Sequence, residues 1–392
     1  MRTPFLVLSP VLLAAPMAMA ERPPIELELD SETVLVVSAL GDDDQGANSE
    51  GFLAETSLIG TAESVLDNGV RLRSRIALRV QKDNPFRPGF SGGFGTDPAA
   101  APGAFSGFSS GPVPNGDGDD LRGRFETAYF QIDGGYGELR LGKDQGIAAR
   151  FFEGAPEVLS HARADNALLD PTGLSGVRTR HDLTGPSAKL SYATPRLLGF
   201  RAGLSYTPEA DADGLDRRPA AGGALSAPDT ENAIELALNG SRTLRDSGLK
   251  IDGTLAWSKA DTKTRFGSAP YEDTETLSAG LRLEQGRWSG GLSSLNSGNG
   301  LPNADYTAWS TGLMREGDLF DISIKYGEAE DDGANLEATS WRLGVGKTFS
   351  GGTKLALAYL DDEIAGPTQT QSNQGIVFEI TLSGEMFALT SY

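Results

Sequence analysis

Residues 70–80 of the chain read VRLRSRIALRV, and this stretch decides the fold class. Its two faces differ in chemistry, with Val70, Leu72, Ile76, Leu78 and Val80 at even positions and Arg71, Arg73, Arg75 and Arg79 at odd positions. Because successive side chains of a strand point to opposite faces, the pattern predicts a strand with one apolar and one arginine face. A guanidinium that faced hydrocarbon near the midplane of a bilayer would cost about 2–4 kcal/mol, so the arginines must face water.

The same period of two recurs along the chain in segments of about ten residues, the length that a tilted strand needs to cross hydrocarbon. Apolar faces of this kind include Ala188/Leu190/Tyr192, Ile234/Leu236/Leu238, Phe320/Ile322/Ile324/Tyr326 and Ile376/Phe378/Ile380/Leu382. Short turns such as 67–69, 246–248 and 350–352 alternate with longer polar loops at 41–50, 81–121, 144–177, 208–231, 260–273, 297–304, 329–335 and 363–374. This alternation predicts an all-β, transmembrane, antiparallel up-and-down β-barrel of sixteen strands, wide enough for an aqueous channel.

A secreted multi-domain β-sandwich would also contain alternating strands. Its inward face would pack into a core, however, and would not meet a ladder of arginines. Aromatic residues also gather near the strand ends, as in the girdles of membrane barrels: Tyr192, Tyr206, Trp257, Trp288, Tyr326, Trp341 and Tyr359. These features favour the barrel.

The composition excludes several other classes. None of the 392 residues is cysteine, which excludes disulfide scaffolds, thiol catalysis and iron–sulfur clusters. A formal net charge of −20 is unsuited to nucleic acid. There is no Walker A, dinucleotide-binding glycine triplet or HExxH motif, and His161 and His181 complete no catalytic set, so we expect no enzyme. His181 is expected at the start of a strand.

The first twenty residues resemble a secretory signal. Arg2 is followed by an apolar stretch over residues 5–15, and Ala18-Met19-Ala20 forms a small-residue cleavage site. We predict a signal peptide over residues 1–20 and a barrel over residues 21–392, located in the cell outer membrane after export.

Two hairpins resemble those of a known family. Residues 125–146, FETAYFQIDGGYGELRLGKDQG, resemble the pattern AY-x-x-L…GG-x-G-x-x-x-x-G-[RK] of trimeric Gram-negative porins. Residues 187–206, SAKLSYATPRLLGFRAGLSY, are similar to the following S-x-x-Y-x-[ST]-P…GF…Y hairpin. The repeat extends the resemblance over residues 25–386, and the composition resembles that of alphaproteobacterial porins. The resemblance implies a homotrimer in which a long, inward-folded third loop constricts each barrel.

The candidate channel residues follow from these patterns. Arg71, Arg73, Arg75 and Arg79 form one basic wall, which Arg124 and Arg140 extend on the next two strands; Tyr129 is expected on the outer face with Phe125. The candidate constriction loop, 144–177, carries Asp144, Glu153, Glu157, Asp165 and Asp170. Acids opposite a basic wall would create a transverse field that orients water and dipolar solutes. Alternatively, the acids form a solvated loop face and the arginines only keep the lumen wet.

The loop over residues 81–121 has two candidate roles. Its spaced phenylalanines, Phe86, Phe90, Phe94, Phe105 and Phe108, suit either a latch onto a neighbouring subunit, as in the porins it resembles, or a mobile cover. Asn115, Asp117 and Asp119 have the spacing of calcium ligands but lack the glycine that an EF-hand loop requires. We expect no cofactor, and at most loosely bound Ca²⁺ that bridges acidic loops to lipopolysaccharide.

The end of the chain departs from the family pattern, because Phe387 and Leu389 are out of register with Met386 and Ala388. The last strand is expected either to end near residues 382–386 or to run to Tyr392.

We therefore expect a porin for passive diffusion of small hydrophilic solutes and ions. Its expected partners are further copies of the same chain, outer-membrane lipid and lipopolysaccharide. The alternatives are a substrate-specific sugar or anion porin, and a surface receptor or adhesin barrel with a blocked lumen. Fixed negative charge at the mouth predicts a weak preference for cations, which the arginines oppose.

Overall fold

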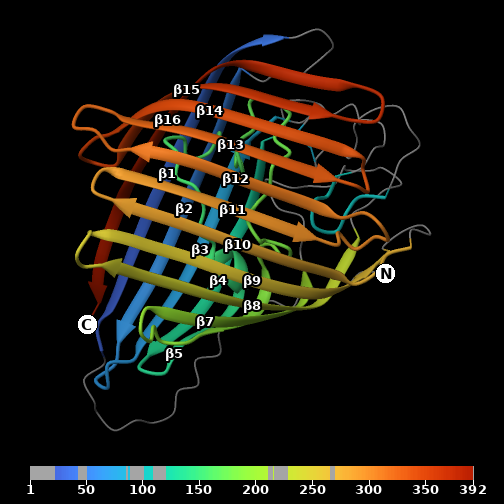
Figure 1. The fold of residues 1–392 in the computed structure, drawn as a ribbon. Coiled ribbons are helices and arrows are strands. Elements are labelled where there is room, and N and C mark those ends of the chain that lie inside the picture. Colours follow the sequence, from blue (N-terminus) through green and yellow to red (C-terminus); the bar gives the residue numbers. More distant parts are fainter. Residues whose placement is uncertain are drawn as a thin grey trace.

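A computed structural model of the chain describes residues 23–42, 51–84, 87–88, 101–108, 121–210, 215, 228–264 and 270–391. Sixteen antiparallel strands form a closed barrel in which each strand pairs with the next and β1 pairs with β16 (Figure 1). The predicted up-and-down barrel is confirmed. Across the described ranges, no helix is long and apolar enough to cross a membrane.

The strands on the first half of the wall are β1 (Ile25–Asp42), β2 (Phe52–Val65), β3 (Arg71–Lys82), β4 (Arg122–Gly134), β5 (Gly137–Asp144), β6 (Ser187–Ala193), β7 (Phe200–Ala210) and β8 (Asp229–Leu244). Those on the second half are β9 (Leu249–Lys263), β10 (Thr274–Gln285), β11 (Trp288–Ser297), β12 (Tyr306–Arg315), β13 (Asp321–Asp331), β14 (Leu336–Thr348), β15 (Thr353–Ala365) and β16 (Thr370–Ser391). One short helix, α1 (Ile147–Phe151), follows β5.

The two rims of the barrel differ in the length of their connections. Short turns at 66–70, 135–136, 194–199, 245–248, 286–287, 316–320 and 349–352 gather at one rim, on the left of Figure 1, which we call the turn rim. The long connections, including 83–121 and 145–186, leave the opposite rim, which we call the loop rim. The chain begins and ends its barrel at the turn rim, where Ile25 pairs with Ser391.

Apolar residues face outward and polar residues face the interior, the reverse of a soluble protein. On β14, Trp341, Leu343 and Val345 are exposed on the outer face, whereas Ser340 and Arg342 between them are buried. This inversion is stable only when the outer face meets lipid, because large exposed apolar areas are unfavourable in water.

The described strands contain three register shifts, in β4, β8 and β16, and those in β4 and β16 explain places where the sequence pattern breaks. In β4, Glu126 is an extra residue opposite β3, so the inward positions change from even to odd numbers after it. Tyr129, expected on the outer face, therefore lies inside and is buried. In β16, Met386 is the extra residue, and the strand continues past it to Ser391. Of the two expected endings, the longer one is observed, and Tyr392 lies outside the described residues.

The connection between β5 and β6 folds into the barrel, as predicted for the third loop (Figure 1). We call residues 145–186 the third loop; it ends nine residues later than the expected 177. It follows the inner surface closely. The inward faces of Gly280 and Gly291 leave room for the loop backbone, because a Cβ on Gly280 would overlap the carbonyl oxygen of Glu153. His181, expected to begin a strand, is buried in this loop and hydrogen-bonds Ser258 and Ser278.

Candidate functional site

The arginine face of β3 points into the barrel, with a carboxylate beside most of its members. Glu63 of β2 pairs with Arg71 at 3.0 Å and with Arg73 at 2.6 Å. Arg79, nearer the loop rim, lies 3.5 Å from Glu55 and 3.9 Å from Glu126. The predicted basic ladder therefore exists, and β2 and β4 supply carboxylates that partly neutralise it.

Arg75 differs from the rest of the ladder. In the register of the sheet its neighbours are Thr61 on β2 and Tyr129 on β4, neither of which is acidic. Among the described residues, no carboxylate forms an ion pair with Arg75, whose side chain lies partly in solvent. Arg75 is therefore a positive charge near the middle of the wall that no ion pair offsets.

Arg140 on β5 continues the basic wall, as predicted. Its guanidinium pairs with Glu138 at 2.8 Å and with Asp144 at 2.7 Å, and it lies 4.5 Å from the centre of the Tyr129 ring. Such an arrangement holds the guanidinium against the wall through both charge and the ring face. Arg124 shares the inward face with Arg79, directly opposite it in the sheet.

Two further arginines converge on Glu138; Arg150 belongs to the candidate constriction loop, whereas Arg201 was not identified from the sequence. Arg150, in α1 at the start of the third loop, hydrogen-bonds one oxygen of Glu138, and Arg201 on β7 lies 3.0 Å from the other. Three guanidinium groups thus share one carboxylate, which leaves an excess of positive charge at this place.

Asp144 and Glu153, two of the predicted loop acids, lie on either side of the start of the third loop. Asp144 is the last residue of β5, so it belongs to the basic wall through its pair with Arg140. Glu153 is half-buried, and burial together with the nearby charge of Asp252 raises its pKa.

Glu157 and Asp165 are fully buried rather than exposed to the channel. Lys325 of β13 contacts both carboxylates, at 3.6 Å from Glu157 and within hydrogen-bond contact of Asp165. Although burial opposes ionisation of Asp165, Lys325 and Arg163 hold the pKa of its carboxyl well below the usual range. Burial raises the pKa of Glu157, even though Lys325 and Arg163 lie nearby. These groups fasten the loop to the wall.

Asp170 has a similar anchoring role. Its carboxylate accepts hydrogen bonds from the backbone N–H groups of Thr172, Gly173 and Ser175, at 3.2, 3.0 and 2.8 Å. The Thr172 hydroxyl also lies 2.8 Å from Asp362 on β15. Burial raises the pKa of Asp170 above its usual value.

Arg342 of β14 also joins the third loop to the barrel wall. It binds Asp362 through both terminal nitrogens, at 2.6 and 2.9 Å, and donates to the Ala162 carbonyl at 3.1 Å.

The expected opposition of loop acids and basic wall does not hold for Glu157, Asp165 and Asp170, because none of the three side chains has exposed surface. Glu157 and Asp165 contact Lys325 of β13, and Asp170 binds backbone N–H groups of its own loop. Glu153 and Asp182 remain partly exposed on the loop, together with two cations. The Arg163 side chain is 27% exposed whereas its partner Asp165 is 0% exposed, and Arg180 is also partly exposed. The interior surface is therefore more basic than the loop composition suggests.

A second ladder, which is acidic, lies on β1 and was missed. Glu26, Glu28, Asp30 and Glu32 alternate with Leu27, Leu29 and Ser31 near the turn rim. Glu26 is paired in the sheet with Glu63 and therefore shares its inward face. The signal was the same period of two that identified the arginine ladder.

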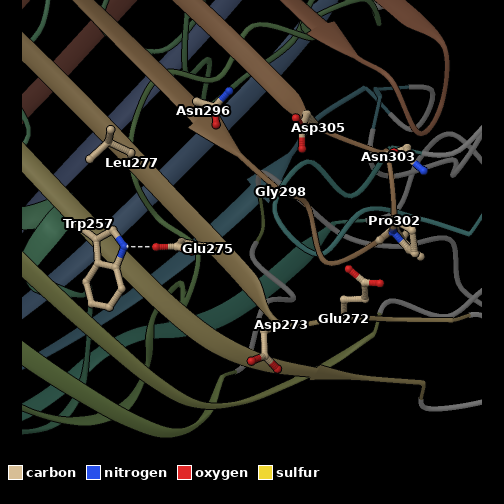
Figure 2. A pocket seen from close by; sticks show the side chains of 11 residues that line it. Trp257, Glu272, Asp273, Glu275, Leu277, Asn296, Gly298, Pro302, Asn303 and Asp305 are labelled. Atoms are coloured by element: carbon tan, nitrogen blue, oxygen red, sulfur yellow. Dashed lines mark hydrogen bonds between the residues drawn. The ribbon is translucent and has the colours of Figure 1, made fainter.

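The outer surface near the loop rim carries an acidic recess (Figure 2). Trp257 donates a hydrogen bond of 2.6 Å to Glu275, and Glu272, Asp273 and Asp305 lie around the same recess. In the part of the chain that the structure describes, no three acidic or histidine side chains are arranged to hold a metal ion. The weak calcium candidates Asn115, Asp117 and Asp119 lie outside that part.

Comparison with solved structures agrees with the barrel. OmpF of Salmonella typhi, in complex with daunomycin, matches with a TM-score of 0.58 at 11% identity, over 91% of this chain and 97% of that one. OprB of Pseudomonas putida matches with a TM-score of 0.57 at 10% identity, over 92% of this chain and 94% of that one. The anion-selective porin from Comamonas acidovorans matches with a TM-score of 0.53 at 13% identity, over 92% of this chain and 98% of that one.

No curated protein sequence matches the chain significantly. The family model described as Gram-negative porin, however, matches residues 7–364. With this match and the sixteen-stranded barrel, the protein belongs to the Gram-negative porin family and is a multi-pass channel protein of the outer membrane.

Proposed function

We propose that this porin passes small hydrophilic solutes and ions by diffusion and prefers anions at its constriction. The preference differs from the weak cation selectivity that net charge predicts. Charge at a wide mouth acts only over about a Debye length, ~10 Å at 0.1 M salt. Charge at the constriction acts on every ion that passes, in a space with little water to screen it.

The observation that carries this proposal is the unequal exposure of partners in the interior ion pairs. Arg73 is 31% exposed and Glu63 20%, while Arg163 is 27% exposed and Asp165 is fully buried. Arg140 is likewise more exposed than Glu138 and Asp144. At these pairs a permeating ion therefore meets more guanidinium than carboxylate surface, and Arg75 adds a charge that no ion pair among the described residues offsets.

Planar-bilayer recording under a KCl gradient tests the proposal. We expect stepwise openings and a reversal potential of the sign that chloride preference produces, with a magnitude that falls as salt rises. A reversal potential of the opposite sign would contradict the preference for anions. It would show that the negative charge at the mouth determines the ion selectivity. Absence of conductance in correctly folded protein would favour the receptor or adhesin alternative.

Liposome swelling separates general diffusion from a sugar-specific channel. General diffusion predicts swelling rates that fall smoothly with the size of neutral sugars. A single sugar that passes faster than smaller ones would support the substrate-specific alternative.

We infer that the protein assembles as a homotrimer. The inference is supported by the porin family and by OmpT of Vibrio cholerae, solved in a trimer form, which matches at a TM-score of 0.53 and 11% identity over 92% of this chain and 99% of that one. Crosslinking and native mass measurement in mild detergent should give a trimer that resists heat and detergent. Monomer alone in both measurements would contradict it.

Lipopolysaccharide is the proposed partner of the acidic recess around Trp257. Divalent cations would bridge its phosphates to single carboxylates of this recess, such as Glu272, beside an interfacial aromatic residue at the loop rim (Figure 2). Removal of divalent ions with a chelator should then lower the amount of lipopolysaccharide that copurifies. An unchanged amount would contradict this role.

A further inference from the structure

Residues 101–108, part of the connection between β3 and β4, are held inside the loop rim by Asn299. The Asn299 side-chain oxygen accepts hydrogen bonds from the backbone N–H groups of Phe105 and Ser106, both at 3.0 Å. Its amide nitrogen donates to the Ser106 hydroxyl at 3.1 Å and to Asp331 at 3.2 Å. The Ala104 N–H also donates to the Asn299 carbonyl at 2.7 Å. Asn299 thus holds three successive residues, Phe105 and Ser106 through its side chain and Ala104 through its backbone carbonyl.

Two phenylalanines of this segment fill space in the barrel interior. Phe105 is fully buried, and its ring centre lies 5.6 Å from that of Tyr306 on β12. Phe108 lies 6.0 Å from the same ring, edge to face, and Arg178 of the third loop lies 5.4 Å above it. Both belong to an apolar cluster that includes third-loop residues and inward-facing residues of the second half of the wall, namely Leu174, Val177, Leu183, Ala308, Leu336, Ala338 and Ile364.

The beginning of the same connection is joined to the third loop as well. Arg87 is buried, pairs with Asp83 at 2.8 Å, and donates hydrogen bonds to the backbone carbonyls of Ala167 and Leu168. The two connections are therefore interlocked within one barrel. Phe105 and Phe108 thus dock in their own barrel, while Phe86, Phe90 and Phe94, the other phenylalanines considered for a latch or a cover, lie outside the described residues.

We propose that residues 101–108 are a second size-determining element of the channel, above the third loop at the extracellular mouth. The inference rests on the channel function proposed above. Two buried aromatic rings and their clamp occupy cross-section that solutes would otherwise use. Because the side chains that fill this space are apolar and neutral, the segment limits solute size and leaves the charge of the channel unchanged.

The double substitution Phe105→Ser/Phe108→Ser tests the proposal, since it removes the apolar anchor. We expect roughly 1.5-fold higher single-channel conductance and entry of larger neutral sugars into liposomes, with an unchanged reversal potential. Asn299→Ala should act in the same direction. Phe320→Ser is the matched control, because Phe320 is exposed in a turn at the opposite rim.

A crosslink separates docking from loss of fold. Ser106 Oγ and Asn299 Nδ2 are 3.1 Å apart and the chain has no cysteine, so Ser106→Cys/Asn299→Cys adds a single pair of thiols. The oxidised protein should keep wild-type conductance and size limit, and reduction should raise both. Unchanged conductance in the phenylalanine variant, with proteolysis showing the segment released, would overturn the proposal. Loss of trimer with an unchanged pore would also overturn it. Failure of the channel function itself would appear as a silent wild type.

Discussion

The anchored side of the third loop and the arginine face of β3 use the same kinds of charged residue in opposite surroundings. Lys325 and Asp165 are entirely buried, whereas Arg73 and Glu63 remain partly in water. Removing one partner of a buried pair costs about 3–5 kcal/mol, because the other charge is left without compensation. An exposed pair contributes about 0.2–1 kcal/mol. The comparison shows that burial decides whether a charge holds the channel together or acts on permeating ions.

The largest effect is expected from Asp165→Asn. This change leaves Lys325 in a buried site without its ionised partner, and we expect about 3–5 kcal/mol of loop docking to be lost. Trypsin should then cleave at Arg163, and single-channel current should become higher and noisier. Asp318→Asn is the control, because its pair with Arg287 lies in an exposed turn. If the two variants behaved alike, burial would not be what distinguishes the two regions.

A smaller effect is expected when the unpaired arginine of the basic wall is compared with a paired one. Arg75→Gln removes a charge that pairs with no carboxylate of the described ranges, so the chloride-to-potassium permeability ratio should fall by roughly twofold. The double variant Arg73→Gln/Glu63→Gln removes one charge of each sign and should change the ratio less. Reversal potentials of the two variants under the same salt gradient make the comparison. A larger change in the double variant would show that pairing does not determine which arginine acts on ions.

The smallest effect concerns His161, which joins the loop to the other side of the barrel. Its Nε2 lies 3.3 Å from Glu55 on β2, and its backbone N–H donates to Glu379 on β16 at 2.9 Å. Burial disfavours the charged ring, but Glu55, Glu379 and Glu32 outweigh it and raise the pKa of His161.

A raised folded-state pKa makes the stabilisation complete below the unfolded pKa of about 6.5, and it is lost as pH rises through the folded value. The third loop should therefore resist proteolysis better at pH 6 than at pH 8, and His161→Gln should flatten this difference. Equal protection of the wild type at both pH values would contradict the assignment.

Regular alternation made much of the barrel predictable. The inward placement of Arg71, Arg73, Arg75 and Arg140 follows from a period of two in short, uninterrupted strands. The same rule failed at Tyr129, because the extra residue Glu126 reverses the two faces, a change of phase that shows in the sequence only as apolar Phe130 and Ile132 at even positions. It was not applied to Glu26, Glu28 and Asp30, although their pattern is as regular.

The contacts made by the charged residues of the third loop could not be predicted from the sequence around them. Asp165 meets Lys325, 160 residues later in the chain, and His161 meets Glu55, 106 residues earlier. Nothing in the sequence near Asp165 distinguishes a carboxylate that will be buried from one that will line the water.

The fold class, the sixteen strands and the existence of an arginine face follow from the order of residues, because each depends on the alternation of neighbours along one strand. The place where each loop docks depends on closure of the barrel. Only a closed wall brings the interior faces of β13 and β15 to Asp165 and Thr172, and only the mouth of that wall brings Asn299 to Phe105. Contacts across the lumen, rather than the pattern along the chain, therefore set which charges and which rings define the channel.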